Sequence, residues 1–534
     1  MAKSGELVDS CTSLGRSTGD HVTISMAKGW LDKCLREHQG CSQQDDTLQY
    51  ARPARLLDLQ HGVRLVDSSK AEVAPYVTLS HCWGDPTHVT RLLSSNEALF
   101  RQGQIRGLPQ TFLDAIYVTM ELGYRYLWVD SLCIIQDSKQ DWEIQAKTMA
   151  LVYANSVFTI AAVKSSGSTE GCFTKDRNPL GQRILRRPDL GIMALPIDEL
   201  LMWFVEVDTM GPDDASPLHS RAWVIQERHS SPRTLLYGKH GIYWECRCAK
   251  ASEHGYIEVA WDSGDNRKTW LQRLLQFECE QGSSTSRQPW VDKWNGMLTL
   301  YSGCQLTVKG DKIIAFTGLL AEIERRSRPA RRCILGIWDH DLPRMALWNR
   351  CQNSDRPIQL FPRLTNGMPT WSWASVEGSC HYMIYDVKLQ WRADIHIDES
   401  PTPASMVIRS WRRNVLQKGA ADGNSDTNTY PSLALGPTDG RMGEKGKGGN
   451  SDTDYRWWPD CVTPDESTPL QIVQIARFSM SEGGTTKAWC LVIMPKPPGA
   501  GEYERVGLTV LRYREPLDDP FSKEEGLCET IRIV

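Results

Sequence analysis

Three apolar runs, separated by segments of helical spacing, constrain the fold more than any other feature of the sequence. The runs cover residues 76–80, 124–136 and 157–163, and the second reads YRYLWVDSLCIIQ. Near-continuous apolar runs of this kind are typical of strands that are buried on both faces of a parallel sheet. We therefore expect three strands here, all in one sheet.

The segments between the runs have the period of helices. A proline opens residues 109–123 and a glycine closes them, and Phe112, Ile116 and Met120 recur at helical spacing in between. Residues 141–154 again carry apolar side chains at helical spacing. Strands that alternate with helices of this length indicate an α/β fold built around a parallel sheet.

The length of the chain indicates more than one packed region. Its 534 residues exceed the roughly 250–300 at which a single core stops growing. We expect an N-terminal extension at 1–70 and a mixed, β-rich α+β region at 256–534. Residues 418–454 are rich in Gly, Asp, Ser and Asn, which predicts a disordered insertion. Their flanks at 389–416 and 457–494 are β-like, so the insertion is expected between strands of one domain.

Composition excludes several classes of protein. Hydrophobic residues make up 40% and charged residues 24%, as in globular proteins, and the net charge of −4 gives no reason to expect nucleic acid or an anionic membrane as partner. No apolar run is long enough to span a bilayer, and the first residues lack the apolar core of a signal peptide. Sixteen cysteines in so long a chain do not make a disulfide scaffold. We expect a reduced, cytoplasmic protein. A small-molecule substrate and a homo-oligomeric state are both compatible with this composition.

Tryptophan is unusually frequent, with twenty residues against ten of phenylalanine. Its side chain combines a large apolar face with a single N–H donor. Some of these tryptophans are therefore expected to line pockets or to tie buried loops.

Familiar catalytic motifs are absent from the sequence. It contains no GxxxxGK[ST] phosphate loop, no GxSxG elbow, no HExxH and no GxGxxG. These absences argue against the commonest nucleotide-phosphate, esterase and zinc-protease functions. Three other groups of residues remain as candidates.

The first group follows the predicted strand 76–80 and consists of Ser80, His81, Cys82 and Trp83. Parallel sheets bind ligands beyond the carboxyl ends of their strands, so these side chains are well placed. A His beside a Cys suggests nucleophilic catalysis, although neighbours on a strand point to opposite faces. Because buried free cysteines are common, packing of Cys82 is the favoured interpretation over a covalent role.

The second candidate is Asp130, which lies inside the apolar run 124–136. A carboxylate there is costly unless it is paired or hydrogen-bonded. It either faces a ligand at the mouth of the strand, or it binds Arg221 or a backbone turn. Ion-pair networks and active sites perturb carboxylates alike, so the sequence favours neither alternative.

The third group contains Trp223 and Glu227, which lie one helical turn apart on a shared face. A carboxylate next to an indole can be held partly desolvated, which raises its pKa towards values useful for acid/base chemistry. His229 follows directly. The alternative is an exposed helix in which Glu227 pairs with Arg228 or Arg233, and spacing alone favours that alternative.

Cys34, His38 and Cys41 have spacing that could suit a metal ion. Cys and His four residues apart on a helix can share a metal, and Cys41 could supply a third ligand. A fourth ligand is not visible nearby, and the spacing differs from that of a standard zinc finger. We therefore expect packing and no metal, with the three residues close together on a helix and turn.

Three blocks of sequence together resemble the heterokaryon incompatibility (HET) domain of fungal proteins. They are YVTLSHCWG at 76–84, LPQTFLDAIYVTMELGYRYLWVDSLCIIQDSKQDWEIQAKTMALVYANSVFTIAA at 108–162, and SRAWVIQER at 220–228. The flanks WLDKCLREHQGC and YWEC are similar to the family as well. The resemblance covers most of the chain except 418–454, and it implies a HET domain at 71–255.

The resemblance implies a role in fungal non-self recognition, where incompatible fusion triggers programmed cell death. The HET fold is thought to resemble the Toll/interleukin-receptor (TIR) domain, a flavodoxin-like α/β sandwich. Several TIR domains hydrolyse NAD with a Glu four residues after a Trp, and Glu227 stands in that relation to Trp223. NAD would then be a substrate, and no cofactor is implied. The candidate catalytic residues are Glu227, His229, Asp130, His81 and Cys82, and the candidate substrate-binding residues are Ser80, Trp83, Arg221 and Trp223.

Two departures from the family pattern leave other functions open. His81 stands where the family commonly has Tyr, and His229 and Ser230 stand where apolar residues are usual. Polar residues in a core-facing segment cost stability unless they are hydrogen-bonded or used. One alternative is a HET-fold enzyme recruited to fungal secondary metabolism, with His229 and His81 as acid/base groups on a small organic substrate. Another is a signalling module that triggers death by assembly alone.

Overall fold

The structure, a computed structural model of the chain, divides into two compact units. Unit 1 comprises Met1–Arg273 with Ile314–Leu319, and unit 2 comprises Leu274–Ile313 with Leu320–Val534. The residues that the structure describes are 15–42, 52–69, 75–175, 216–239, 241–253, 255–258, 274, 289–327, 329–351, 362–382, 389–400, 404–418, 432–435, 455–461, 468–479, 485–496, 501–514, 520–521 and 527–534.

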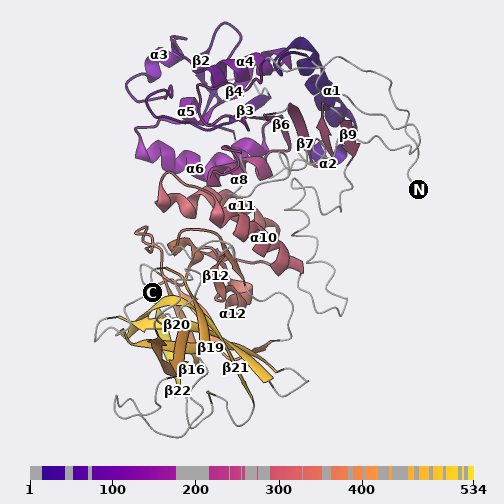
Figure 1. The fold of residues 1–534 in the computed structure, drawn as a ribbon. Coiled ribbons are helices and arrows are strands. Elements are labelled where there is room, and N and C mark those ends of the chain that lie inside the picture. The colour runs from indigo at the N-terminus through magenta and orange to yellow at the C-terminus, as the bar shows by residue number, and fades with distance from the viewer. Residues whose placement is uncertain are drawn as a thin grey trace, which may run out of the picture. The chain divides into compact units, whose positions relative to one another are not determined.

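Unit 1 is built on a nine-stranded sheet whose centre is parallel (Figure 1). Strand β3 (Tyr76–Ser80) pairs in parallel with β4 (Tyr126–Trp128) on one side and with β5 (Thr159–Ala161) on the other. Strand β5 in turn pairs in parallel with β6 (Arg233–Tyr237). All residues of these four strands are buried, as expected for apolar strands covered on both faces. The predicted α/β core with a parallel sheet is confirmed.

Antiparallel strands extend this sheet at both edges. Strand β1 (Arg55–Asp58) pairs with β4, and β2 (Arg64–Asp67) forms the edge beyond it. At the other end β7 (Ile242–Cys246), β8 (Ala249–Ser252) and β9 (Gly255–Glu258) follow β6 in succession. The complete order is β2-β1-β4-β3-β5-β6-β7-β8-β9. Part of the predicted N-terminal extension thus belongs to the same sheet as the parallel core.

The strand expected over residues 124–136 is much shorter than predicted. It ends at Trp128, and the one-turn helix α5 (Asp130–Cys133) follows at once. Its C-cap Ile134 donates its backbone N–H to the carbonyl oxygen of Asp130 at 3.1 Å. A buried strand and a buried helical turn are both apolar throughout, so periodicity alone does not separate them.

Helices cover both faces of the parallel core. Figure 1 shows α4 (Gln110–Glu121) on the opposite side of the strands from α6 (Lys139–Ala154) and α8 (Ala222–Ser230). This alternation is what right-handed crossovers produce when the chain steps first to one side of β3 and then to the other. None of the helices in the described part of the chain has the length and apolar character that crossing a bilayer would require. Further helices in the described part of unit 1 include α1 (His21–Glu37), α2 (Gln39–Ser42) and α3 (Glu97–Arg101).

Helix α4 buries a different face from the one predicted. Of its three apolar residues at helical spacing, only Phe112 is buried, whereas Ile116 is half-buried and Met120 is 53% exposed. The buried face carries Asp114, whose Oδ2 accepts a hydrogen bond from the backbone N–H of Cys172 at 2.7 Å. Phe112, Ala115, Val118 and Leu122 form the apolar part of this buried face, and Asp114 anchors the helix to the loop after β5.

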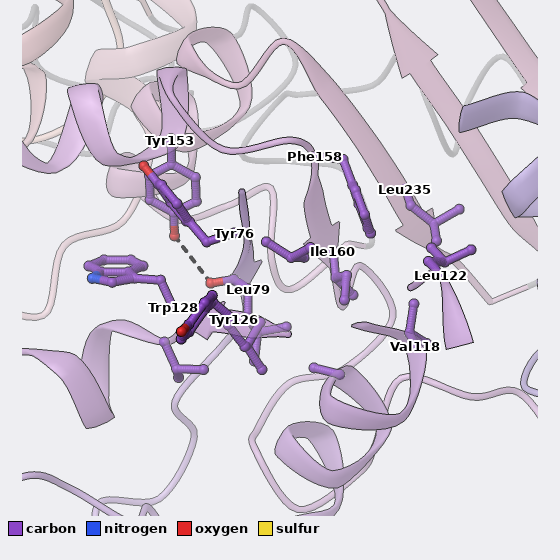
Figure 2. Packing of buried hydrophobic residues seen from close by; sticks show 14 of the residues in the cluster. Tyr76, Leu79, Val118, Leu122, Tyr126, Trp128, Tyr153, Phe158, Ile160 and Leu235 are labelled. Atoms are coloured by element: carbon purple, nitrogen blue, oxygen red, sulfur yellow. Dashed lines mark hydrogen bonds between the residues drawn. The ribbon is translucent and has the colours of Figure 1, made fainter. Parts of the chain in front are cut away.

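The core of unit 1 joins the parallel strands to the helices around them (Figure 2). Trp128 of β4 meets Tyr153 of α6 edge to face, with their ring centroids 5.5 Å apart. The Tyr153 hydroxyl donates a hydrogen bond to the carbonyl oxygen of Leu79 at 3.2 Å. The end of β3 and the last turn of α6 are thereby fixed to each other.

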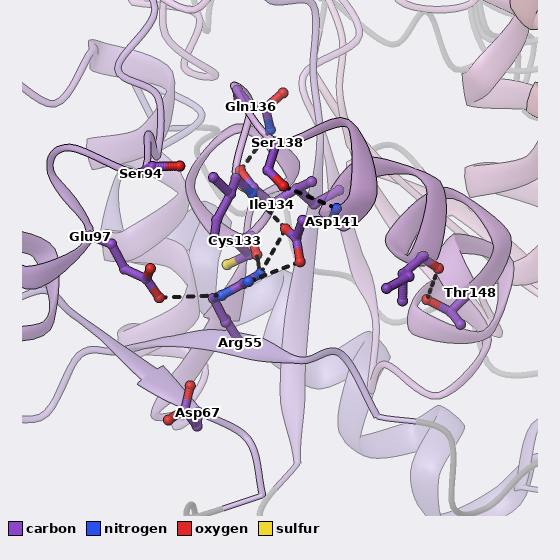
Figure 3. A network of polar contacts seen from close by, with 12 residues as sticks. Arg55, Asp67, Ser94, Glu97, Cys133, Ile134, Gln136, Ser138, Asp141 and Thr148 are labelled. Atoms are coloured by element: carbon purple, nitrogen blue, oxygen red, sulfur yellow. Dashed lines mark hydrogen bonds and ion pairs between the residues drawn. The ribbon is translucent and has the colours of Figure 1, made fainter.

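A partly buried polar network fixes the segment that follows β4 (Figure 3). Arg55 of β1 makes two hydrogen bonds to the Asp141 carboxylate, at 2.9 and 3.0 Å. Its guanidinium also donates to the carbonyl oxygen of Cys133 at 3.0 Å. The same carboxylate accepts the backbone N–H of Ile135 at 2.8 Å. These contacts hold the turn that carries Asp130 at the end of β4.

Unit 2 contains a second nine-stranded sheet, which is almost wholly antiparallel. Its strands run in the order β14-β19-β20-β21-β18-β17-β16-β15, and β16 also pairs with β19, so the pairing closes on itself. The strands are β14 (Gln390–Trp391), β15 (Asp394–Asp398), β16 (Ser405–Lys418), β17 (Ser432–Leu435), β18 (Tyr455–Pro459), β19 (Leu470–Ser479), β20 (Thr485–Pro495), β21 (Glu502–Arg514) and β22 (Leu527–Ile533). Strand β22 pairs with both β16 and β21.

The flanks of the predicted insertion belong to this one sheet, as expected. Strand β17 lies within residues 418–454 and pairs with β16 and β18, whereas the rest of that segment beyond Lys418 lies outside the described residues. The helix-like pattern that the sequence shows near residue 274 lies outside them too, apart from Leu274 itself.

Shorter elements complete unit 2, and buried tryptophans tie them together. Trp348 donates its Nε1–H to the carbonyl oxygen of Trp371 at 2.8 Å, and Trp373 donates to that of Gly336 at 2.8 Å. Both bonds join segments far apart in sequence, as predicted for this residue. The elements are α10 (Pro289–Gly303), η2 (Lys309–Lys312), the part of α11 (Ile314–Arg326) from Leu320 onward, β10 (Cys333–Ile334), β11 (Ile337–Trp338), η3 (Asp339–Asp341), α12 (Leu342–Met345), β12 (Trp348–Arg350), η4 (Trp373–Ser375) and β13 (Cys380–Tyr382).

Candidate functional site

The loop after β3 lies at the carboxyl end of the central parallel strand. Ser80, His81 and Cys82 are buried, and Trp83 is half-buried. Gly84 ends the loop with a φ of +73°, and a Cβ there would lie 2.6 Å from the Cα of Gly167. Only glycine combines this conformation with so close an approach, so the loop is held against the segment after β5.

Asp130 lies beside this loop, at the end of the neighbouring strand β4. Its Oδ2 accepts a hydrogen bond from Trp83 Nε1 at 2.8 Å, and its Oδ1 accepts the backbone N–H of Ser131 at 2.7 Å. Its side chain is 20% exposed, so the carboxylate reaches the surface. Of the alternatives for this residue, the structure shows a carboxylate at the mouth of its strand that also binds a backbone turn.

The imidazole of His81 is buried without hydrogen bonds. Neither ring nitrogen has a hydrogen-bond partner among the residues that the structure describes, and Nδ1 lies 3.9 Å from Asp130 Oδ1. Its ring meets Phe112 of α4 edge to face, with the centroids 5.0 Å apart. Burial is the main cause that lowers the pKa of His81 to about 4, while the Asp130 charge opposes the shift and the Arg221 charge adds to it. The ring is therefore neutral near pH 7, with one unfilled donor and one unfilled acceptor.

Glu227 is fully buried on α8, and it faces the end of β3. Burial raises its pKa to about 7, and the Asp130 charge acts in the same direction. The charge of Arg221 and hydrogen bonding with the side chains of Ser80 and Tyr153 lower the pKa. Its Oε2 has no hydrogen-bond partner. A carboxyl group that titrates near neutral pH suits acid/base chemistry.

Arg221 is the N-cap of α8, and it links this helix to the loop after β3. Its Nη1 donates a hydrogen bond to the carbonyl oxygen of His81. Burial raises the pKa of the Cys82 thiol, although the nearby Arg221 charge opposes this shift. Because the thiolate is the nucleophilic form, this environment favours packing of Cys82 over covalent catalysis.

The other two predicted residues of α8 have different neighbours. Trp223 is half-buried and meets Trp142 of α6, with their ring centroids 6.5 Å apart and their planes at 82°. His229 is half-buried in the last turn, where its Nδ1 lies 2.8 Å from the carbonyl oxygen of Ile225. This contact of His229 runs within its own helix and gives it no link to Glu227.

Contacts and electrostatic coupling therefore bring together seven of the nine predicted residues. They are Ser80, His81, Cys82, Trp83, Asp130, Arg221 and Glu227. Tyr153 was not predicted as a site residue, although it lies within the helix expected at residues 141–154. Its hydroxyl bonds the end of β3 and also acts on Glu227. The only sequence feature that could have identified this residue is that a tyrosine on a buried helix face needs a hydrogen-bond partner for its hydroxyl.

A small cavity lies on the other side of Ser80, between the sheet and α8. Its volume of about 10 Å³ matches the space that one water molecule needs. Arg228 borders it and donates its Nε–H to Glu245 at 3.0 Å, while both side chains are buried. The lining residues are Ser80, Thr159, Ala161, Leu218, His219, Val224, Arg228, Thr234 and Leu236.

A separate cluster contains the residues with metal-ligand spacing. Cys34, His38 and Cys41 lie close together, as the sequence predicts, and all three are buried. The structure adds Cys246, which lies more than 200 residues further along the chain and completes a set of four.

The buried Glu227 predicts a pH-dependent stability. Its pKa of about 7 in the folded chain exceeds the reference value of 4.5, so between these values the folded state holds a proton that the unfolded state has lost. The free energy of unfolding should therefore fall as pH rises through this window, by about 3 kcal/mol in total. Glu227→Gln lacks the titrating group. The melting temperature of the variant, relative to the wild type, should rise by roughly several degrees between about pH 5 and pH 8. A difference that does not change with pH would contradict the buried position.

Comparison with known proteins agrees with this geometry. The family model described as heterokaryon incompatibility protein (HET) matches residues 76–227. The match starts at the first residue of β3 and ends at Glu227, so it covers the strands, loops and helix that form the candidate site. No curated protein and no solved structure matches the chain. Residues 76–227, which form most of the parallel core of unit 1, therefore match a HET domain.

Proposed function

We propose that this protein acts in fungal non-self recognition and triggers programmed cell death by hydrolysing NAD in its HET domain. The observation that supports this function is Glu227, a buried carboxyl group with a pKa of about 7 beside Ser80, Tyr153 and Arg221. Such a group is expensive to keep in a core, and its Oε2 has no partner that would explain it structurally.

The order of the parallel strands supports a TIR-like and flavodoxin-like core. Starting from β3, the chain adds β4 on one side and then β5 and β6 on the other. This is the order 2-1-3-4 of flavodoxin-like sheets, whose ligands bind beyond the carboxyl ends of the strands where the order reverses. The Ser80–Trp83 loop follows the strand at that reversal, and Asp130 follows its neighbour.

The chemistry that this site would perform needs no cofactor. The bond between the nicotinamide nitrogen and the ribose C1′ breaks, and its electron pair leaves with nicotinamide as a neutral molecule. Water then adds to the positive C1′ and loses a proton, which gives ADP-ribose. The Glu227 carboxylate would stabilise the developing positive charge and accept the proton of the water, as carboxylates do in glycoside hydrolysis.

Neighbouring residues would bind and orient the substrate. Arg221 supplies a cation for the diphosphate, and half-buried Trp83 supplies an aromatic surface that its bond to Asp130 keeps in place. The Ser80 hydroxyl lies near Glu227 and could direct the carboxylate. His81 would remain neutral and would donate or accept hydrogen bonds without transferring charge.

The geometry favours this function over a role in secondary metabolism. That alternative depends on His229 and His81 as acid/base groups. The hydrogen-bonding contact of His229 at Nδ1 lies within its own helix, and the pKa of His81, lowered to about 4 by burial, leaves no cation near neutral pH. These observations therefore do not support either histidine as the general acid that this alternative requires.

The test is direct incubation of the purified full-length chain with NAD. We expect release of nicotinamide and ADP-ribose in equal amounts, measured by chromatography, and loss of viability in fungal cells that are induced to express the protein. Cell death without any NAD cleavage, in vitro or in the dying cells, would favour signalling by assembly. Neither cleavage nor death, with folded protein and detected expression, would reject the proposed function.

A further inference from the structure

Four potential metal ligands meet where the N-terminal helices contact the sheet of unit 1. Cys34 lies in the last turns of α1, His38 is the C-cap of that helix, and Cys41 lies in α2. Cys246 is the last residue of β7, which packs against α1. The four ligand atoms lie within 4.8 Å of one another, and His38 Nδ1 is 3.4 Å from Cys246 Sγ.

This arrangement has the ligand type and spacing of a tetrahedral zinc site. Zinc binds Cys sulfur at about 2.3 Å and His nitrogen at about 2.0 Å, so tetrahedral ligands lie roughly 3.4–3.8 Å apart. The distance between His38 and Cys246 is in that range, and the spread of the set to 4.8 Å requires only small side-chain movements to enclose an ion. All four residues are at most 7% exposed, so no position is left open to solvent.

A buried arginine supplies an independent indication of negative charge at this cluster. Arg233 of β6 is 5% exposed, and its Nε–H donates to Cys34 Sγ at 3.1 Å. Its other two acceptors are the carbonyl oxygens of Cys41 and Val157, both at 3.1 Å, and neither is a carboxylate. Because a buried cation is costly without an anion, the sulfur atoms are its natural counterion.

The charges of these groups balance if a divalent ion is bound. Three thiolates, one neutral imidazole and Zn²⁺ carry a net charge of −1, and the Arg233 guanidinium brings the total to zero. Without the ion, three neutral thiols would leave the guanidinium uncompensated, whereas three thiolates would leave an excess of two negative charges. The hydrogen bond from Arg233 to Cys34 also resembles the second-shell contacts that orient metal ligands.

We propose that Cys34, His38, Cys41 and Cys246 bind a structural zinc ion. The ion fastens α1 and α2, which precede the segment matched by the HET family model, to β7, which follows it. With four protein ligands the site is closed, so its role is in folding rather than catalysis. This inference does not depend on the proposed NAD hydrolysis.

The first experiment measures metal in the full-length wild-type protein. Protein produced in zinc-supplemented medium and dialysed should hold about one zinc per chain by elemental analysis. Replacement by Co²⁺ should give the visible absorption of a tetrahedral site with cobalt–thiolate charge-transfer bands. Wild-type protein that holds no metal after reconstitution, or cobalt spectra without thiolate bands, would overturn the proposal.

Single substitutions identify the ligands. Cys246→Ala and Cys34→Ala should lower the zinc content to less than about a tenth of the wild type, because a four-ligand site rarely tolerates the loss of one. Cys133→Ala is the matched control, since this thiol is equally buried in the same core but lies outside the cluster, and it should keep the zinc. Loss of zinc from folded Cys133→Ala, or its retention in both ligand variants, would overturn the assignment.

Cys248 provides a second control at the edge of the cluster. Its Sγ lies 3.8 Å from Cys41 Sγ, but the residue is half-buried and is not one of the four. Cys248→Ala should keep its zinc. If that variant loses zinc while Cys246→Ala keeps it, the proposed ligand set is wrong. If the ligand variants fail to fold, the wild-type metal content and the cobalt spectra still decide the proposal.

Discussion

Glu227→Gln is expected to lower the rate of NAD cleavage by about 10²–10⁴-fold, which is the usual contribution of a positioned acid or base. Glutamine has nearly the same volume and fits the same buried place, but it neither carries charge nor accepts a proton. Chromatography of released nicotinamide measures the effect. In cells the variant should also fail to kill, and its melting temperature should be no lower than that of the wild type at neutral pH, because the cost of a buried charge is gone.

The pH dependence of the wild type gives the same prediction a second readout. If the carboxylate is the active form, cleavage should increase as pH rises through about 7, where Glu227 ionises. Stability should fall over the same range, so activity and stability should change in opposite directions. Glu143→Gln on α6 is the matched control, because it also removes one negative charge but from a side chain that is 53% exposed. Full activity of Glu227→Gln would show that Glu227 is not the catalytic carboxylate.

The parallel core was predictable because its signals are local. Strand β3 matches its predicted range of residues 76–80, since an apolar run bounded by glycine and proline has few alternatives. The strand at 124–136 was too long in the prediction, because the buried turn α5 has the same apolar composition as the strand before it. The face of α4 was wrong for a different reason. The helix carries more than one apolar stripe of helical spacing, and only contacts with distant residues, such as that between Asp114 and Cys172, distinguish the buried stripe of Ala115, Val118 and Leu122 from the others.

The candidate site shows the same division between local and distant signals. Asp130 was recognisable as a charge inside an apolar run, whereas spacing alone favoured an exposed Glu227 and only the family resemblance indicated a role for it. The contribution of Tyr153 depends on the packing of α6 against α8 and was not visible in the sequence. Cys246 lies in the YWEC segment, which resembles the family. Its position beside Cys34 results from the antiparallel pairing of β6 with β7, and the spacing of cysteines along the sequence does not predict this pairing.

Arg228→Met is expected to destabilise unit 1 by about 3–5 kcal/mol, although Arg228 is the immediate neighbour of Glu227. Its side chain is 3% exposed and that of Glu245 is 0% exposed, and the guanidinium donates to the carboxylate from Nε and Nη2. Removing the arginine leaves a carboxylate that is buried without its counter-charge. The midpoint of the first unfolding transition in urea, followed by tryptophan fluorescence, measures the loss.

The double variant Arg228→Met/Glu245→Leu distinguishes the stability that the ion pair contributes from the stability that is lost when only one of its partners is removed. Without either charge, apolar side chains of similar volume fill the same space, and such replacements of buried pairs are often neutral. We expect the double variant to recover at least about half of the stability lost by Arg228→Met. If it is no more stable than the single variant, the pair contributes through shape and through contacts such as that with His219, 3.5 Å from Arg228, rather than through charge. The two adjacent side chains of α8 differ in role. The charge at residue 228 is compensated by Glu245 inside the core, whereas the charge at 227 is kept at the expense of stability, as expected for a residue retained for chemistry.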